Sequence, residues 1–297
     1  MKTLTQCAMI PVVEQPKAQQ PVTVQDDLLE QLADAGRKDD RDMDLAGTAL
    51  LLAGLDHPDI PLETYRRHLA GLAADVAALG HRGSSLEGRA WAIARVLFER
   101  HGFEGDRSSY DDMDNADLMR VIDRKRGIPV SLGILYIHIA RSIGWTIEGL
   151  NFPTHFLLRL DGHGDRAIVD PFESGTVLDV PALRDLAKQV MGPDAEMDRD
   201  WFDPIGNRGI LLRLQNNIRT RAIKNGELER GAEITRRMIL VAPDSITLQR
   251  DLGMVEAHCG NVGAAIAAFH SFLEHDPQGA ERTEAEQMLN KLKRALN

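Results

Sequence analysis

Two stretches in the last third of the chain repeat one another at a fixed distance. Leu214, Ile218 and Ile239 have apolar counterparts 34 residues later, and Gly226 and Pro243 recur unchanged at the same distance. The matching positions are Leu248, Leu252, Leu273, Gly260 and Pro277. A period of about 34 residues is typical of repeats built from two helices, with Gly at the turn inside each pair. This part of the chain is therefore expected to fold as stacked helix pairs.

The period predicts two repeats of the tetratricopeptide type, at 209–242 and 243–276. A final helix, Ala280–Leu296, is polar enough to cap them. Two repeats are too few for a long concave groove. Such repeats usually bind peptides or dock on neighbouring domains, and both possibilities remain open.

The middle of the chain predicts a helix followed by strands. Val130–Ile143 has apolar residues at helical spacing, between Pro129 and Gly144. Ser131 would lie in the first turn, where unpaired main-chain N–H groups and the helix dipole favour negative charge. Three strands are expected after it, at Thr146–Phe152, His155–Leu160 and Arg166–Asp170. The last two would form an antiparallel hairpin closed by a five-residue turn.

This hairpin register would bring His155 within one residue of lying opposite Asp170, close enough for an imidazole–carboxylate hydrogen bond. Ser131, His155 and Asp170 would then form a nucleophile–base–orienter triad. Each residue also has a structural interpretation. A Ser in a first helical turn commonly bonds the backbone, an isolated His is commonly structural, and Asp170-Pro171 is a turn signal.

The run RGIPVSLGILYIHIARSIGWTIEGLNFPTHFLLRL, with AIVDPFESG after it, resembles a bacterial family of transglutaminase-like, tetratricopeptide-repeat proteins of the SirB invasion-regulator type. The resemblance extends from about Asp26 to the C-terminus, and Asn115 and Leu118 match the family's lead-in. It implies an α+β fold: a helical N-terminal part, a papain-like core with a helix on an antiparallel sheet, and C-terminal helical repeats. It also implies that the family's catalytic Cys, His and Asp fall on Ser131, His155 and Asp170, with Asn115 capping a helix or ordering the loop near the site.

Ser131 departs from this pattern in a chemically important way. A Cys at a helix start beside a His becomes a thiolate near neutral pH. A Ser hydroxyl instead needs a general base during attack and a well-formed oxyanion hole. The favoured interpretation is therefore a non-catalytic protein that works through contacts with a protein or peptide, without a cofactor or metal. The alternative is a Ser–His–Asp hydrolase or acyl transferase that uses Ser131, and a third possibility is a repeat scaffold with an incidental triad.

The composition excludes several other classes. The chain has 297 residues and a formal net charge of −10, which argues against non-specific binding to nucleic acid or anionic membrane. Its two cysteines, Cys7 and Cys259, fit neither a metal site nor a disulfide framework, so a reducing cytoplasm is expected. No apolar run approaches the roughly 20 residues that cross a bilayer, and the first residues are too poor in apolar character for a signal peptide.

Four modules are expected: a loose tail at 1–24, a helical module at 25–103, the transglutaminase-like core at 104–197, and the repeats at 198–297. Helices are predicted in the second module at Asp26–Ala35, Met43–Leu55, Leu62–Leu79 and Leu86–Arg100. The acidic segment Glu104–Asp123 lacks the pattern of a calcium loop. It is expected to be a solvated loop that leads into a helix at Leu118.

Overall fold

The N-terminal part of the molecule is helical, as expected. The computed structural model describes residues 23–80, 85–162 and 164–295, so Cys7 and nearly all of the predicted tail lie outside the described residues. Four helices come first: α1 (Val24–Arg37), α2 (Leu45–Gly54), α3 (Leu62–Ala78) and α4 (Leu86–Ala94), with a short 3₁₀ turn η1 (Asp40–Asp42) between the first two. Side chains of Thr23, Asp44 and Ser85 accept hydrogen bonds from main-chain N–H groups at the starts of α1, α2 and α4, which fixes where these helices begin.

A short parallel pair, β1 (Glu104–Gly105) and β2 (Arg126–Gly127), encloses the acidic segment. The π-helical turn η2 (Arg95–Arg100) extends α4 and precedes β1. Within the acidic segment lie η3 (Met113–Ala116) and α5 (Leu118–Arg124), and β2 leads directly into α6 (Pro129–Ser142). The predicted helix after Pro129 is therefore present, and Gly144, with a φ of 83°, follows its end.

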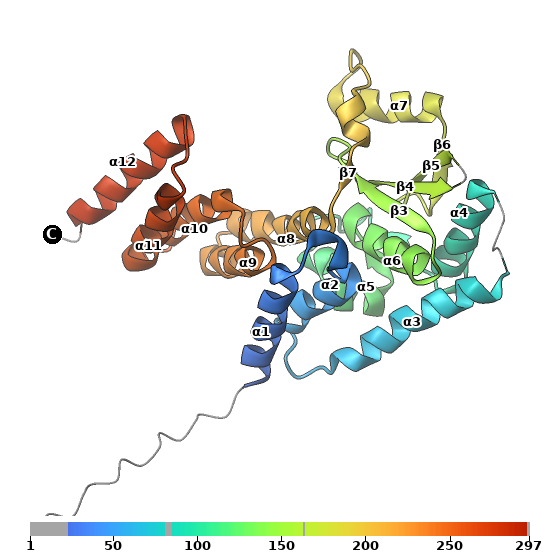
Figure 1. Ribbon diagram of the computed structural model, residues 1–297, viewed down its shortest axis with the longest axis horizontal. Helices are drawn as coiled ribbons and strands as arrows, with labels where there is room; N and C mark the ends of the chain where they lie inside the picture. The colour runs from blue at the N-terminus through green and yellow to red at the C-terminus, as the bar shows by residue number, and fades with distance from the viewer. Residues whose placement is uncertain (1–22, 81–84, 163, 296–297) are drawn as a thin grey trace, which may run out of the picture.

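A five-stranded antiparallel sheet lies between two layers of helix (Figure 1). Its order is β6-β5-β4-β3-β7, where the strands are β3 (Thr146–Leu150), β4 (Leu157–Gly162), β5 (Asp165–Asp170), β6 (Thr176–Leu178) and β7 (Pro204–Ile205). One face packs on α6 through Phe156, Leu158 and Val169, which belong to the main hydrophobic core. The other face packs on α7 (Val180–Met191) through Leu150, Leu157 and Leu183.

The predicted hairpin has a different turn. Gly162 pairs with Asp165 and Leu160 with Ala167, so two residues connect the strands where five were expected. Asp161 and Gly162, expected in the turn, instead extend β4 and pair with Arg166 and Asp165 of β5. Between α7 and the first repeat helix lie η4 (Arg199–Phe202) and β7, which pairs with β3.

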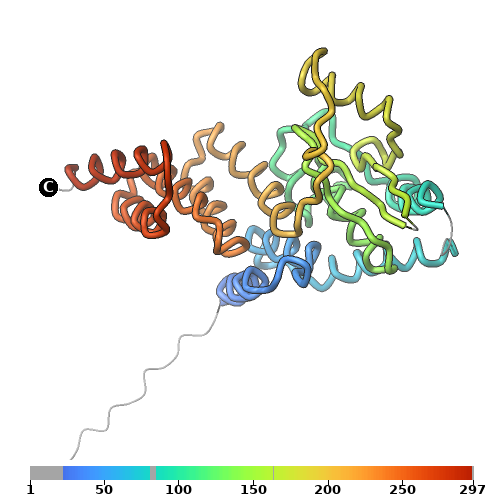
Figure 2. The backbone as a smooth tube through the Cα atoms, turned by 45° about the horizontal axis from the view of Figure 1, so that its top comes forward, coloured from blue at the N-terminus to red at the C-terminus, as the bar shows by residue number. Residues whose placement is uncertain are grey.

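The C-terminal helices form the predicted pairs: α8 (Asn207–Lys224) with α9 (Leu228–Val241), α10 (Ile246–His258) with α11 (Val262–Glu274), then α12 (Ala280–Ala295). Gly226 and Gly260 make the turns inside the pairs with φ of 82° and 79°, a conformation that disfavours other residues. Figures 1 and 2 both show this segment projecting away from the sheet, with α11 and α12 farthest from it.

The first helix pair is part of the main core. Ile210, Leu211 and Leu214 of α8 and Ile234 of α9 are buried in the same cluster as α6 and the N-terminal helices. Phe269, Phe272 and Leu289, from α11 and α12, form a separate cluster. The architecture is thus the expected α+β fold with helical repeats, while the borders at 103/104 and 197/198 stay predictions. No helix within residues 23–80, 85–162 and 164–295 combines the length and the apolar character needed to span a bilayer.

The contact between α1 and α9 can be tested at Gly36. A Cβ built on Gly36 would lie 1.8 Å from the main-chain oxygen of Leu240, so the two helices would have to separate. We expect Gly36→Ala to lower the free energy of unfolding by about 1–3 kcal/mol. The matched control is Gly71→Ala in α3, where a Cβ meets no atom within 4 Å, and which should stabilise by about 0.5–1 kcal/mol. Urea denaturation measures both; equal effects of the two substitutions would contradict this packing.

Candidate functional site

An imidazole–carboxylate pair lies where two interior strands of the sheet, β4 and β5, begin and end. His155 precedes β4 and Asp170 ends β5, and His155 Nε2 is 2.8 Å from Asp170 Oδ2. The main-chain N–H groups of Phe172 and Glu173 donate to the other carboxylate oxygen, at 2.8 and 3.2 Å. Asp170 is only 2% exposed. Its three hydrogen-bond partners fix the orientation of the buried carboxylate. Since Asp170 holds Nε2, the imidazole atom that remains for acid–base chemistry is Nδ1.

The residue after His155 anchors this pair. The ring of Phe156 is buried between α6 and β3, where Gly133 and Gly149 make room for it. A Cβ at Gly133 would lie 2.4 Å from the Phe156 ring, and one at Gly149 would lie 2.8 Å from it. Larger residues at either glycine would displace Phe156 and, with it, His155.

The main chain around His155 is held from the repeat side as well. Thr154 has a φ of 55°, a left-handed conformation that costs free energy for a β-branched residue. Arg213 of α8 donates from Nη2 to the main-chain oxygen of His155 at 2.7 Å, and its guanidinium lies 5.5 Å from the centre of the Phe156 ring. The position of His155 therefore depends on the first repeat helix.

Ser131 has different partners. It lies in the first turn of α6 and is 0% exposed. Its hydroxyl donates to the main-chain oxygen of Asn115 at 2.7 Å and accepts from the N–H of Ile128 at 3.1 Å. A Cβ at Gly127 would lie 2.5 Å from Ser131 Oγ, so the hydroxyl is tightly enclosed. Among the hydrogen bonds of the described residues, none joins Ser131 to His155. His155 pairs with Asp170, whereas the Ser131 hydroxyl bonds main-chain atoms.

Asn115 links Ser131 to the acidic segment. Its amide nitrogen donates to Asp106 Oδ2 at 3.2 Å and to the main-chain oxygen of Ser109 at 2.7 Å. It does not cap the helix at Leu118, because the side chain of Asp117 accepts from the N–H of Arg120 and performs that role. Asn115 instead orders the loop, and it is completely buried.

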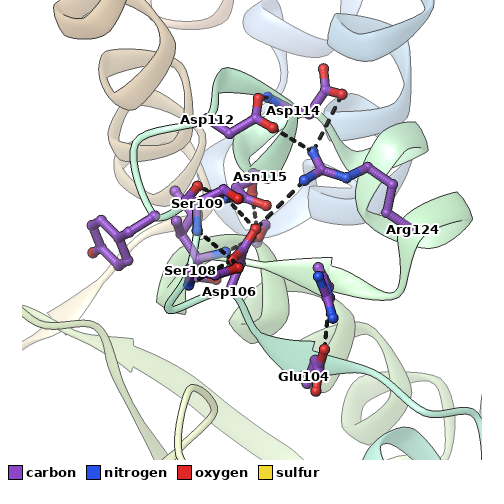
Figure 3. A network of polar contacts seen from close by, with 12 residues as sticks. Glu104, Asp106, Ser108, Ser109, Asp112, Asp114, Asn115 and Arg124 are labelled. Atoms are coloured by element: carbon purple, nitrogen blue, oxygen red, sulfur yellow. Dashed lines mark hydrogen bonds and ion pairs between the residues drawn. The ribbon is translucent and has the colours of Figure 1, made fainter.

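The acidic segment is more ordered than a solvated loop. Asp106 and Asp117 are 2% and 7% exposed, so the expected solvation is wrong for both. Figure 3 shows Arg124 reaching into the segment, where its guanidinium lies 3.1 Å from Asp112, 3.3 Å from Asp114 and 3.5 Å from Asp106. Arg124 thus occupies the place among these carboxylates that a cation would take. Burial raises the pKa of Asp106, but hydrogen bonds from Ser109, Ser108 and Asn115 outweigh it and hold that pKa below its usual value.

Several residues around the imidazole–carboxylate pair were not expected from the sequence. Tyr110 packs edge-on against Phe172, with ring centres 5.9 Å apart, and Arg213 approaches from α8. Together with His155 and Asp170 they form what we term the dyad surface (Tyr110, His155, Asp170, Phe172 and Arg213). The available signal was a polar stripe on α8, where Arg213, Asn217 and Arg221 follow one another at four-residue spacing.

The acidic network predicts a pH-dependent contribution to stability. Because folding holds the pKa of Asp106 below its usual 3.8, the carboxylate stabilises the fold above pH 3.8, and this contribution is lost as pH falls through the folded-state pKa. We expect Asp106→Asn to lower the free energy of unfolding by about 1–3 kcal/mol at neutral pH, and by less below pH 3.8. Urea titrations across pH measure this. Asp111→Asn is the control, since that side chain is 92% exposed; an Asp106→Asn effect that is the same at every pH would contradict the role of the network.

Comparison with known proteins agrees with this architecture. A family model described as the transglutaminase-like superfamily matches residues 63–216, and a tetratricopeptide-repeat model matches 218–290. A UPF0162 protein of Vibrio cholerae is 30% identical over 239 residues, which cover 79% of this chain and 87% of that protein. A UPF0162 protein of Xylella fastidiosa is 29% identical over 242 residues, covering 80% of this chain and 86% of that protein. F-box only protein 21 of Mus musculus is 39% identical over 82 residues, only 13% of its length. The chain therefore belongs to the transglutaminase-like superfamily, with a tetratricopeptide repeat after its transglutaminase-like segment.

Proposed function

We propose that this protein is a non-catalytic member of the superfamily that acts through protein–protein contacts, with the dyad surface as a binding surface. The observation that supports this best is the state of the Ser131 hydroxyl. Its proton is bonded to the main-chain oxygen of Asn115 and its lone pair to the N–H of Ile128. A nucleophile needs that proton to be directed at a base.

Turning the hydroxyl toward an imidazole would be costly. The rotation would break the two bonds of the hydroxyl and leave the Ile128 N–H and the Asn115 oxygen with only the longer bond of 3.4 Å to each other. Each hydrogen bond lost costs about 0.5–1.5 kcal/mol. The Ser131 position is also closed to solvent, so a substrate carbonyl could reach it only after a rearrangement of the loop that carries Asn115. A thiol could compensate by ionising near neutral pH, whereas a hydroxyl cannot.

The helical repeats support a role in protein contacts. Repeats of this kind commonly serve as protein-binding scaffolds. The first helix pair, α8 and α9, packs on the core. The helices α11 and α12 form their own cluster and project away from the core. Docking on the core is therefore the role of the first pair, and partner contact is left to the second pair and the dyad surface. We also propose a cytoplasmic location, on the cysteine content, and retain the SirB-type relationship as a prediction.

A second candidate is a Ser hydrolase or acyl transferase with Ser131 as nucleophile, His155 as base and Asp170 as orienter. The 2.8 Å contact between His155 and Asp170 favours it, because a buried carboxylate that orients an imidazole is the arrangement such enzymes use. It requires Ser131 to leave Asn115 during the reaction. It predicts labelling of Ser131 by an activated fluorophosphonate, whereas the proposed function predicts none on the folded protein.

Ser131→Ala separates these candidates. If the hydroxyl is structural, the substitution lowers the free energy of unfolding by about 1–3 kcal/mol and changes no release of product from acyl or amide substrates. The control is Ser142→Ala at the end of the same helix, where the side chain is exposed and little change in stability is expected. Urea denaturation and a chromogenic ester and amide assay provide the two readouts. Product release by the wild type that Ser131→Ala abolishes would show that the proposed function is wrong.

A further inference from the structure

The guanidinium of Arg213 has no carboxylate partner within the part of the chain that the structure describes. Its hydrogen bond is a single one, from Nη2 to the main-chain oxygen of His155. Its other two side-chain nitrogens, Nε and Nη1, are not fully buried without a partner, so they are accessible to solvent. Burial lowers the pKa of Arg213, because water is partly removed from a charge that no anion replaces.

The charged groups around Arg213 are paired with one another. His155 is bonded to Asp170, Arg107 pairs with Glu173, and Arg221 pairs with Asp111. Arg107 and Arg221 also lie over the rings of Phe172 and Tyr110, at 5.3 and 5.7 Å from the ring centres. Arg107 and Arg221 thus each have an anion of their own. Arg213 is the one of these three arginines whose guanidinium contacts no carboxylate among the described residues.

We propose that the dyad surface binds an acidic peptide segment of a partner protein by pairing one of its carboxylates with Arg213. This proposal rests on the proposed function, since it names the partner chemistry of that same surface. A planar guanidinium matches a carboxylate with two parallel N–H···O bonds, and such charge-assisted bonds are strong when they are partly shielded from water. Tyr110, a residue that is 40% exposed, offers an apolar surface beside it.

A carboxylate fits this surface better than a phosphate. A carboxylate carries one negative charge and balances the one unpaired guanidinium, whereas a phosphate monoester carries about −1.5 to −2 at neutral pH. The excess charge would face Asp111 and Glu173, which stand beside the site. The Asp106 network adds further negative charge on the same loop, where three carboxylates share Arg124. Binding must therefore come from direct pairing at Arg213 and not from long-range attraction.

The test uses the full-length protein and three pools of fluorescein-labelled peptides of equal length, measured by fluorescence anisotropy. The variable positions hold Asp and Glu in the first pool, Asn and Gln in the second, and phosphoserine in the third. We expect the acidic pool to bind at least about tenfold more tightly than the amide pool, the difference that one charge-assisted pair supplies. Tighter binding of the phosphoserine pool, equal binding of the acidic and amide pools, or no binding would overturn the proposal.

Variants on α8 identify the residue responsible. Arg213→Gln should remove the preference for the acidic pool, and Arg213→Lys, which keeps the charge and the stem on Phe156, should retain part of it. Arg219→Gln is the matched control, because Arg219 lies on the same helix and already pairs with Asp251 at 2.8 Å. An acidic preference that survives Arg213→Gln would overturn the assignment even if the other results hold.

The same samples distinguish failure of this proposal from failure of the proposed function. Cleavage of the peptides by the wild type, lost in Ser131→Ala, would contradict the non-catalytic role. Intact peptides that bind without regard to charge would leave that role standing and contradict only the carboxylate pairing at Arg213.

Discussion

The hydrogen bond from the Ser131 hydroxyl to the main-chain oxygen of Asn115 joins the start of α6 to the loop that precedes α5. The side chain of the same Asn115 donates to Asp106 and to the oxygen of Ser109, so one buried residue connects α6 to the acidic segment. Arg124, at the end of α5, then pairs with three carboxylates of that segment. Because buried polar groups are costly when unpaired, this set of bonds holds together as a unit. It holds the Ser131 hydroxyl on main-chain partners.

Most of the fold was predictable because its signals are local. Apolar spacing placed α2, α3 and α6 within a few residues. Gly226 and Gly260 located the turns between repeat helices, because few other residues adopt their conformation. The hairpin register failed because strand pairing continued through Asp161 and Gly162, residues whose composition indicates a turn. The strand β7 is two residues long and pairs only through tertiary contact, so it had no sequence pattern to reveal it.

The candidate site was predictable only in part, for the same reason. The order of His155 and Asp170 along a hairpin indicated their proximity, and the two side chains do meet. The partners of Ser131 could not be read from the sequence, because Asn115 lies 16 residues away in a short 3₁₀ helix that no sequence pattern indicated. The contact of Arg213 with His155 was not predicted, because the helix that carries Arg213 was identified from its apolar residues alone. Its role depends on how the first repeat packs against the sheet, which no local pattern encodes.

The packing of α8 and α9 joins the first repeat to the transglutaminase-like segment in one hydrophobic core. Arg213 reaches His155 from α8, and Arg221, two turns later, bonds the main-chain oxygen of Tyr110 at 2.9 Å. The helix α8 therefore holds the main chain at both His155 and Tyr110.

The most direct test of this account is the position of Ser131 Oγ in a crystal structure determined at neutral pH. The account predicts that Oγ lies about 2.7 Å from the main-chain oxygen of Asn115 and outside hydrogen-bond distance of the His155 imidazole. A hydroxyl found roughly 2.6–3.2 Å from Nδ1 of His155, with Asn115 released, would contradict it and show an assembled triad.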